Sequence, residues 1–222
     1  MTLIVTSEFD LNQVAAPNLP LAPSAYERLY QDQLNNVLRL YFNRLDAILG
    51  QLSTTGTGDG SSLAFPYGAF SSDQTQTTTA NTATLMTLNT TDFSNNVGLA
   101  IGSKITAVKA GIYNLQFSVQ FQNTDNQIQD ISIWLKQNGT DIAGSAGYVS
   151  IPARKSASAG EEAHEIIGWN YYLSMNAGDY VQIYWSTTLA SVTIKTYAAA
   201  TGPVRPSTQS VVATLSFVSA LP

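Results

Sequence analysis

The stretch GIYNLQFSVQF (residues 111–121) decides the fold class of this chain. Apolar side chains stand at every second position of it: Tyr113, Leu115, Phe117, Val119 and Phe121. The residues between them are mostly polar. Successive side chains of a strand point to opposite faces of a sheet, so this alternation predicts a β-strand with one buried face and one polar face.

Strand patterns continue on both sides of this stretch. We expect strands over 131–135, 141–151, 165–175, 179–188, 191–199 and 208–218, and weaker ones over 64–70, 82–88 and 97–107. The pair Asn138-Gly139 predicts a tight hairpin turn between two of them. Many short strands without an internal repeat predict a mainly β fold, a sandwich or jelly roll of eight to ten antiparallel strands.

The N-terminal part has a helical period instead. Ser24 and Glu27 fit a capping box after Pro23, and Gly50 fits a helix end. The apolar face is too broad for a lone helix in water, so the helix either packs on the β region or bundles with copies of itself, and we favour the bundle. The expected bundle residues are Leu34, Leu38, Phe42, Leu45 and Leu49.

These patterns divide the chain into four segments. Residues 1–23 are expected to form an extended arm, because Pro17, Pro20 and Pro23 disfavour a helix there. Residues 24–52 form the oligomerising or anchoring helix. Residues 53–62 are rich in Gly, Ser and Thr, as flexible linkers are, and 63–222 form the β head.

Composition excludes several kinds of protein. Charged residues make up 11% of the chain, against about 25% in an average domain, and the net charge is −5 with the basic residues scattered, so no nucleic-acid partner is expected. The absence of cysteine excludes disulfides and thiolate metal sites. No signal peptide and no membrane-spanning run is recognisable, so synthesis in a cytoplasm without membrane insertion is expected.

The head region, 63–222, resembles the jelly roll shared by complement C1q globular domains and tumour necrosis factor. The resemblance is carried by Tyr67-Gly68-Ala69-Phe70, by Gly111–Phe117, by Trp134–Gly139, by Leu173–Val181 with its Gly178-Asp179 turn, and by the last strand over 208–218. Leu115 departs from the family, which often has Phe there. The family's Gly-X-Y stalk is also absent, and the helix and linker stand in its place.

The whole chain is similar to small tail-fibre, knob and decoration proteins of bacteriophages, through Leu19-Pro20-Leu21-Ala22-Pro23 and the helix with Leu38–Phe42. This resemblance implies a non-enzymatic homotrimeric virion protein, made in the host cytoplasm. Its N-terminal part would attach to other virion proteins and its head would face outward. The alternative is a receptor- or glycan-binding module at a fibre tip.

The C1q-like resemblance also implies that subunits meet through apolar and aromatic residues of one sheet. The segments 166–173 and 180–185 read as apolar on both faces, which favours burial against a second chain over burial under a loop of the same chain. The expected trimer-interface residues are Tyr113, Phe117, Tyr171, Val181, Ile183 and Trp185.

Residues for chemistry are sparse. His164 is the single histidine, and it stands in a polar segment that we interpret as a loop. With Arg154, Lys155 and Glu161 it forms the expected partner-facing loop. A glycan depolymerase would have to use the cluster Glu161, Glu162 and Glu165. No cofactor is expected, although calcium at Asp125, Asp130 and Asp141 stays open.

Overall fold

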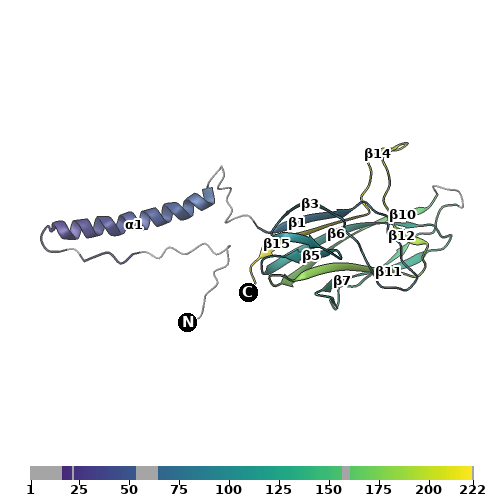
Figure 1. The fold of residues 1–222 in the computed structure, drawn as a ribbon, viewed down its shortest axis with the longest axis horizontal. Helices are drawn as coiled ribbons and strands as arrows, with labels where there is room; N and C mark the ends of the chain where they lie inside the picture. Colours follow the sequence, from purple (N-terminus) through teal and green to yellow (C-terminus); the bar gives the residue numbers. More distant parts are fainter. Residues whose placement is uncertain (1–16, 22, 54–64, 157–160, 222) are drawn as a thin grey trace. The chain divides into compact units, whose positions relative to one another are not determined.

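The computed structural model describes residues 17–21, 23–53, 65–156 and 161–221 of the chain (Figure 1). It divides into two compact units, Met1–Ala64 and Phe65–Pro222. The division falls two residues after the predicted start of the head at 63. Of the predicted arm, 1–23, the structure describes residues 17–21 and 23, which are in neither a helix nor a strand; of the predicted linker, 53–62, it describes Ser53 alone.

The first unit contains the helix α1 (Arg28–Ser53). Its first turn is closed by the backbone N–H of Gln31, which donates to the carbonyl of Glu27, so Glu27 occupies the N-cap position. The predicted capping box at Ser24 is therefore wrong, and the helix begins four residues later than expected. It also continues through Gly50, which does not end it.

The predicted bundle residues lie along α1 with much of their surface open in the isolated chain. Leu34, Leu38 and Leu45 are half-buried, and Phe42 is exposed. The side chain of Leu49 lies outside the described residues. The helix bundle stays a prediction.

The second unit consists of two antiparallel sheets. The first, sheet A, has the order β10 (Ala163–Met175), β6 (Gly111–Asn123), β15 (Val211–Ser219), β1 (Tyr67–Ser72) and β3 (Thr90–Asn95), and β12 (Val192–Ile194) also pairs with β6. Sheet A is thus built around β6, the strand with the clearest sequence pattern.

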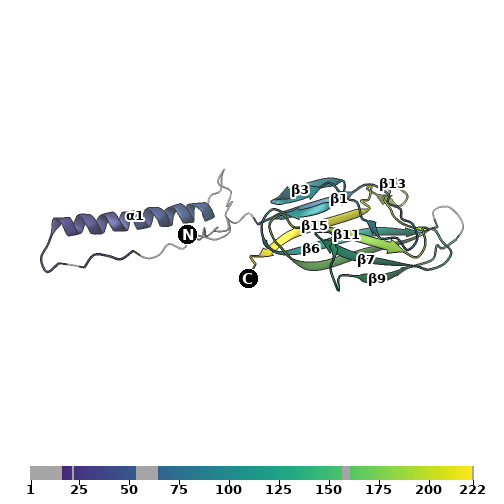
Figure 2. The same ribbon diagram turned by 60° about the horizontal axis from the view of Figure 1, so that its bottom comes forward.

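The second sheet, sheet B, has the order β4 (Val97–Ala100), β5 (Lys104–Ala107), β11 (Tyr180–Thr187), β7 (Gln129–Gln137) and β8 (Thr140–Asp141); β2 (Thr84–Leu85) pairs with β11 and β9 (Gly147–Ile151) with β7. A separate hairpin joins β13 (Ala200–Thr201) to β14 (Val204–Arg205). Figures 1 and 2 show sheet A, with β1 and β3, on one side of the head and sheet B, with β7, on the other.

The core lies between the sheets, where the alternating apolar residues of β6 meet those of β11 and β7. Phe121 and Trp185 come from opposite sheets, and their ring centroids are 5.7 Å apart. Burying such side chains stabilises the fold by roughly 1.5–3 kcal/mol each before entropy is counted. The predicted fold class, a mainly β sandwich of jelly-roll type preceded by one helix, is confirmed.

Several strand predictions need correction. The predicted strand over 141–151 is divided into β8 and β9 by a turn in which Gly144 has positive φ. The predicted strand over 97–107 is divided into β4 and β5 by a turn in which Gly102 and Ser103 have positive φ. Only the start of 191–199 forms a strand, β12, after which the chain leaves sheet A for the β13–β14 hairpin. The edge strand β3 was not predicted, because its exposed sequence TTDFSN has no apolar alternation.

Candidate functional site

The residues predicted to form the trimer interface lie in the core of a single chain. Tyr113, Phe117, Val181, Ile183 and Trp185 are buried between the sheets, and Tyr171 is half-buried against the same core. Side chains enclosed in one chain cannot contact another, so the five buried residues are corrected from interface to core, and Tyr171 packs mainly against that core. The sequence misled because the aromatic residues on the other face of β11, Tyr180 and Tyr184, are apolar too.

The side of sheet A that faces away from the core carries no Asp, Glu, Lys or Arg along β10, β6 and β15. Directly paired residues share a face, and Tyr172 pairs with Asn114, and Ile166 with Gln120. We call this surface the outer face of sheet A, and it comprises Asn114, Gln116, Ser118, Gln120, Ile166, Gly168, Asn170, Tyr172, Val212, Thr214 and Ser216. The polar groups of this face are amides and hydroxyls. Three of its larger apolar or aromatic side chains are exposed to solvent: Ile166, Tyr172 and Val212.

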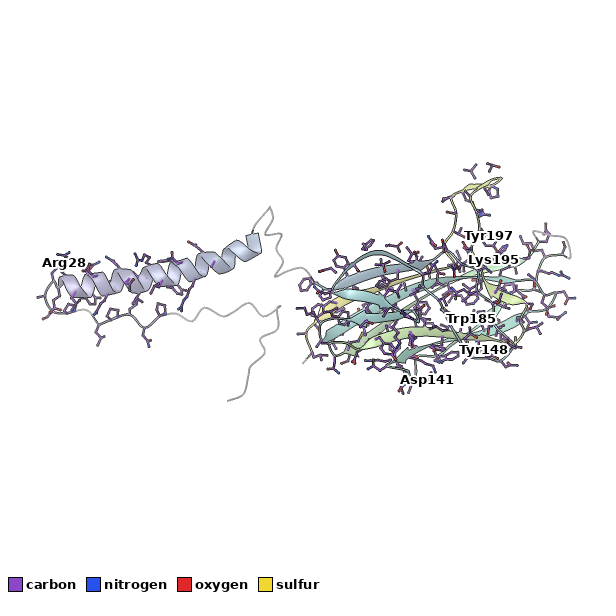
Figure 3. All side chains as sticks on the ribbon, in the orientation of Figure 1. Arg28, Asp141, Tyr148, Trp185, Lys195 and Tyr197 are labelled. Atoms are coloured by element: carbon purple, nitrogen blue, oxygen red, sulfur yellow. The ribbon has the colours of Figure 1, made fainter. Side chains whose placement is uncertain are left out.

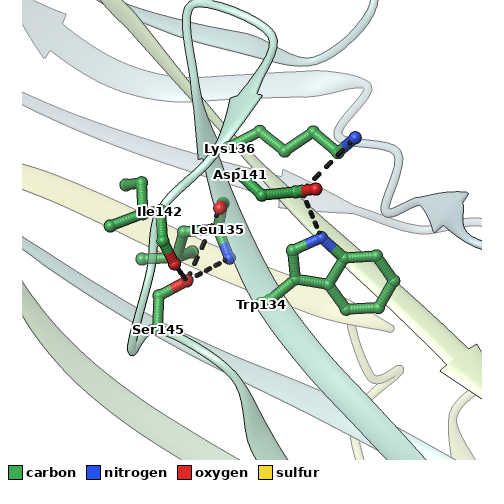
Figure 4. Close-up of polar contacts among 6 residues, drawn as sticks. All are labelled: Trp134, Leu135, Lys136, Asp141, Ile142 and Ser145. Atoms are coloured by element: carbon green, nitrogen blue, oxygen red, sulfur yellow. Dashed lines mark hydrogen bonds and ion pairs between the residues drawn. The ribbon is translucent and has the colours of Figure 1, made fainter.

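The opposite surface, the outer face of sheet B, carries charges with partners. Figure 4 shows the Asp141 carboxylate accepting a hydrogen bond from the Trp134 indole at 2.7 Å and lying 3.3 Å from the Lys136 ammonium. Lys136 also lies over the ring of Tyr184, and Lys104 over that of Tyr180. These contacts are made within one chain, and the Lys136 and Asp141 side chains remain partly exposed to solvent.

A second polar group on sheet B involves Asp130. Its carboxylate accepts hydrogen bonds from the hydroxyls of Ser150, at 2.6 Å, and Tyr148, at 2.5 Å. The bonds from Ser150 and then from Tyr148 lower the pKa of Asp130, because they stabilise the charged form. The same contact raises the pKa of Tyr148.

A pocket of about 330 Å³ opens where the base of the β13–β14 hairpin stands over the outer face of sheet A. Figure 3 places Tyr197 and Lys195 at this base, on the opposite side of the head from Asp141 and Tyr148. Gln120, His164 and Ile166 come from β6 and β10, and the remaining lining residues, Tyr197, Arg205 and Thr208, come from the hairpin and its flanks.

Contacts among the pocket residues fix their positions. The Tyr197 hydroxyl and His164 Nδ1 are 2.9 Å apart and share a hydrogen bond. The Arg205 guanidinium lies over the Tyr197 ring and donates to the carbonyl of Ala198. Burial, together with the nearby Glu162 carboxylate, raises the pKa of Tyr197 to about 12, and Arg205 opposes the rise. Tyr197 is therefore a neutral hydroxyl at neutral pH.

His164 was predicted to lie in a partner-facing loop, and this is wrong. It belongs to β10, where it pairs with Gln122 of β6. The loop itself contains Arg154 and Lys155. The backbone N–H of Arg154 donates to the backbone carbonyl of Asp125, and that of Lys155 donates to the backbone carbonyl of Glu161. Residues 157–160 of that loop lie outside the described residues. The structure thus brings His164 together with Tyr197 and Arg205, three residues that no sequence pattern connects.

The three aspartates considered for calcium do not assemble a site. Among the described residues, no group of three or more His, Cys, Asp or Glu side chains is placed to hold a metal ion. Asp125 accepts from Gln129, while Asp130 and Asp141 have the partners given above. In the same described part of the chain, no helix has the length and apolarity needed to cross a membrane.

Comparison with known proteins gives one kind of match. No family model and no curated protein matches the chain. Among solved structures, the globular domain of zebrafish complement 1qA protein is similar, with 14% identity and a TM-score of 0.41, over 71% of this chain and 99% of that one. A likeness at this level concerns the fold, and no function follows from it.

Proposed function

We propose that this protein is a non-enzymatic, homotrimeric structural component of a bacteriophage particle. Its head associates with two further copies through the outer face of sheet A, and its N-terminal part attaches to other virion proteins. The phage setting, the threefold symmetry and the attachment rest on the sequence resemblances described above. The location of the subunit contact is new, and it replaces the buried residues that the sequence had suggested.

One observation carries the choice of surface. On the outer face of sheet A, Tyr172 and Val212 are exposed among uncharged amides and hydroxyls. The outer face of sheet B instead has four charged side chains: Lys104, Lys136, Asp130 and Asp141. Depletion of charge with enrichment of aromatic residues is typical of the central part of a protein interface. Covering the uncharged face removes no ion from water, so its desolvation is cheap.

The absence of an enzymatic role is part of the proposal. The single histidine has its Nδ1 bonded to a tyrosine hydroxyl and not to a serine. Of the acidic cluster that a depolymerase would need, Glu165 is adjacent to His164 on β10, so their side chains point to opposite faces of the strand. This arrangement supports binding more than catalysis.

The surface assignment is tested by two exposed tyrosines, one on the outer face of each sheet. Tyr172 on sheet A is 60% exposed and Tyr148 on sheet B is 69% exposed. In the full chain we expect Tyr172→Glu to give monomers and Tyr148→Glu to stay trimeric, measured by light scattering after size exclusion. The opposite result, or a monomeric parent chain, would refute the assignment.

A truncated chain separates the contributions of head and helix. Residues 65–222 have their own core, so a chain of residues 63–222 is expected to fold and to keep three times its chain mass. If only the intact chain is trimeric, the helix drives assembly and the outer face of sheet A is not the main contact.

The second candidate function is a receptor- or glycan-binding module. The observation that favours it is the pocket beside the β13–β14 hairpin, which is concave and lined by both polar and apolar groups.

A further inference from the structure

We propose that the pocket formed by Gln120, His164, Ile166, Tyr197, Arg205 and Thr208 binds a neutral saccharide. This inference rests on the glycan-binding candidate above, and the pocket shares Gln120 and Ile166 with the outer face of sheet A. The argument uses four properties of the pocket: its unused hydrogen-bonding groups, its charge balance, its apolar wall and its position on sheet A.

The pocket offers both donors and acceptors that the described residues leave unused. The side-chain amide of Gln120 donates to the Lys195 carbonyl and to the Thr208 hydroxyl. Within the described residues, its Oε1 accepts no hydrogen bond. Within the described part of the chain, His164 forms a hydrogen bond only through Nδ1, and Arg205 only through Nη1. A sugar hydroxyl both donates and accepts, so a polyol matches this mixed set, whereas a pure acceptor or a pure donor would not.

Charge around the pocket favours a ligand without net charge. Arg205 supplies a cation, and Glu162 supplies a carboxylate close enough to Tyr197 to raise the pKa of that residue. A small anion would be attracted by Arg205 and repelled by Glu162, and a small cation would meet the reverse. A neutral ligand avoids both penalties and can bond to either group.

One wall of the pocket is apolar. Ile166 is 67% exposed there, which leaves an aliphatic side chain without cover from its own chain. A pyranose ring presents C–H groups on its faces and hydroxyls around its edge, so it fits a site with one aliphatic wall and polar groups opposite. The volume of about 330 Å³ is near the lower limit of the usual 300–1,000 Å³ range for small-molecule sites and suits one or two sugar rings.

The pocket groups are held by regular structure and not by loose side chains. Gln120 and Ile166 are directly paired across β6 and β10, and the Gln120 amide is fixed by Lys195 and Thr208. The Arg205 guanidinium is stacked on Tyr197. A site whose groups are already positioned loses little conformational entropy on binding.

The pocket stands at one end of the outer face of sheet A, and Gln120 and Ile166 belong to both. These two residues are six residues along their strands from Asn114 and Tyr172, a separation of about 20 Å at strand spacing. Val212, which pairs with Ser118, lies between the two ends. A subunit contact centred on Tyr172 leaves the pocket end accessible.

The test is binding of the labelled full chain to a printed array of saccharides, in which each neutral glycan is matched by a uronic- or sialic-acid derivative of the same backbone. We expect binding to neutral members. Ile166→Trp, which fills the pocket, and His164→Ala, which removes a ring nitrogen, should each weaken it at least tenfold. Both residues are exposed, so both variants are expected to fold, and Tyr148→Phe on sheet B is the matched control.

Three outcomes would overturn the inference: no neutral saccharide bound, binding to acidic members only, or binding lost in Tyr148→Phe but kept in the two pocket variants. The solution mass of each variant is measured in parallel. A monomer that still binds neutral saccharides through the pocket contradicts the trimer and leaves this inference standing. A trimer that binds no neutral saccharide contradicts this inference and leaves the trimer proposal standing.

Discussion

The outer faces of the two sheets differ in how they use the same kinds of residue. On sheet B, aromatic rings are covered by lysines and carboxylates are bonded to Trp134, Tyr148 and Ser150. On sheet A, the aromatic and aliphatic residues Tyr172 and Ile166 are exposed beside neutral amides. The side chains of the outer face of sheet B have partners within the same chain, whereas the larger side chains of the outer face of sheet A remain exposed.

This difference teaches that exposed apolar area alone is a weak guide to an interface. Tyr148 is at least as exposed as Tyr172, yet its hydroxyl already has a carboxylate partner. The more informative feature is what surrounds the apolar residue, because charged neighbours must lose water when the surface is covered and neutral ones lose less.

The largest effect is expected where the inner faces of the two sheets meet. A Cβ at Gly147 of sheet B would come within 1.9 Å of the Trp169 ring of sheet A, whereas a Cβ at Gly98 would meet nothing within 4 Å. Gly147→Ala should therefore lower the free energy of unfolding by about 3 kcal/mol, the upper end of typical overpacking costs. Gly98→Ala should change it by less than about 0.5 kcal/mol in the same urea titration. Equal effects would mean that the sheets do not pack as described.

A buried charge should weaken association on one face alone. Val212→Lys on sheet A should raise the dissociation constant of the trimer by about 10- to 100-fold, which corresponds to about 1.4–2.8 kcal/mol. Ser132→Lys on the outer face of sheet B should leave it unchanged. Both constants are measured by sedimentation equilibrium. A larger effect from Ser132→Lys would move the contact to sheet B.

Acid should act through sheet B. Because hydrogen bonds lower the pKa of Asp130 in the folded chain, its stabilising effect is complete above the unfolded value of about 3.9 and is lost as pH falls through the folded value. Between pH 5 and pH 2.5 the Tm of the parent chain should fall more than that of Asp130→Asn. Asp179, whose pKa is lowered first by the Asn176 N–H, adds to the fall in both chains. Parallel Tm curves would contradict this.

Salt should have the smallest effect. The outer face of sheet A contains no Lys, Arg, Asp or Glu among its residues, so screening has no ion pair there to weaken. Raising NaCl from about 0.05 to about 0.5 M should change the dissociation constant less than about threefold. A strong salt dependence, measured by the same sedimentation method, would point to the charged face instead.

The sequence predicted the fold well where one strand has one buried face. The alternation in β6 marks the buried residues correctly, since Leu115 and its alternate neighbours are in the core. It failed in β11, because Trp185 and Tyr184 are both aromatic although one is buried and the other lies under Lys136 on the outside. Whether an aromatic residue faces the core or a lysine stem depends on the neighbouring strand, which a single sequence does not identify.

The pocket could not be predicted for a similar reason. Its residues come from β6, from β10 and from a hairpin much later in the chain, which β12, paired with β6, precedes. His164 has charged neighbours in sequence, which made it resemble a loop residue. The half-buried Tyr197 and Arg205 belong to no recognisable sequence motif. The short β13–β14 pairing that positions Arg205 likewise has no strand signal of its own.

The place of β15 in sheet A bears on how the chain folds during synthesis. This strand lies between β6 and β1, and its Val211 pairs with Val119 although the two residues are far apart in sequence. Sheet A therefore stays split into two parts until one of its last-translated strands is available, and such long-range pairing is slow. A chain stopped before residue 211 would lack the strand that joins the halves of the sheet, so only a chain translated past this point can present the complete surface to other copies.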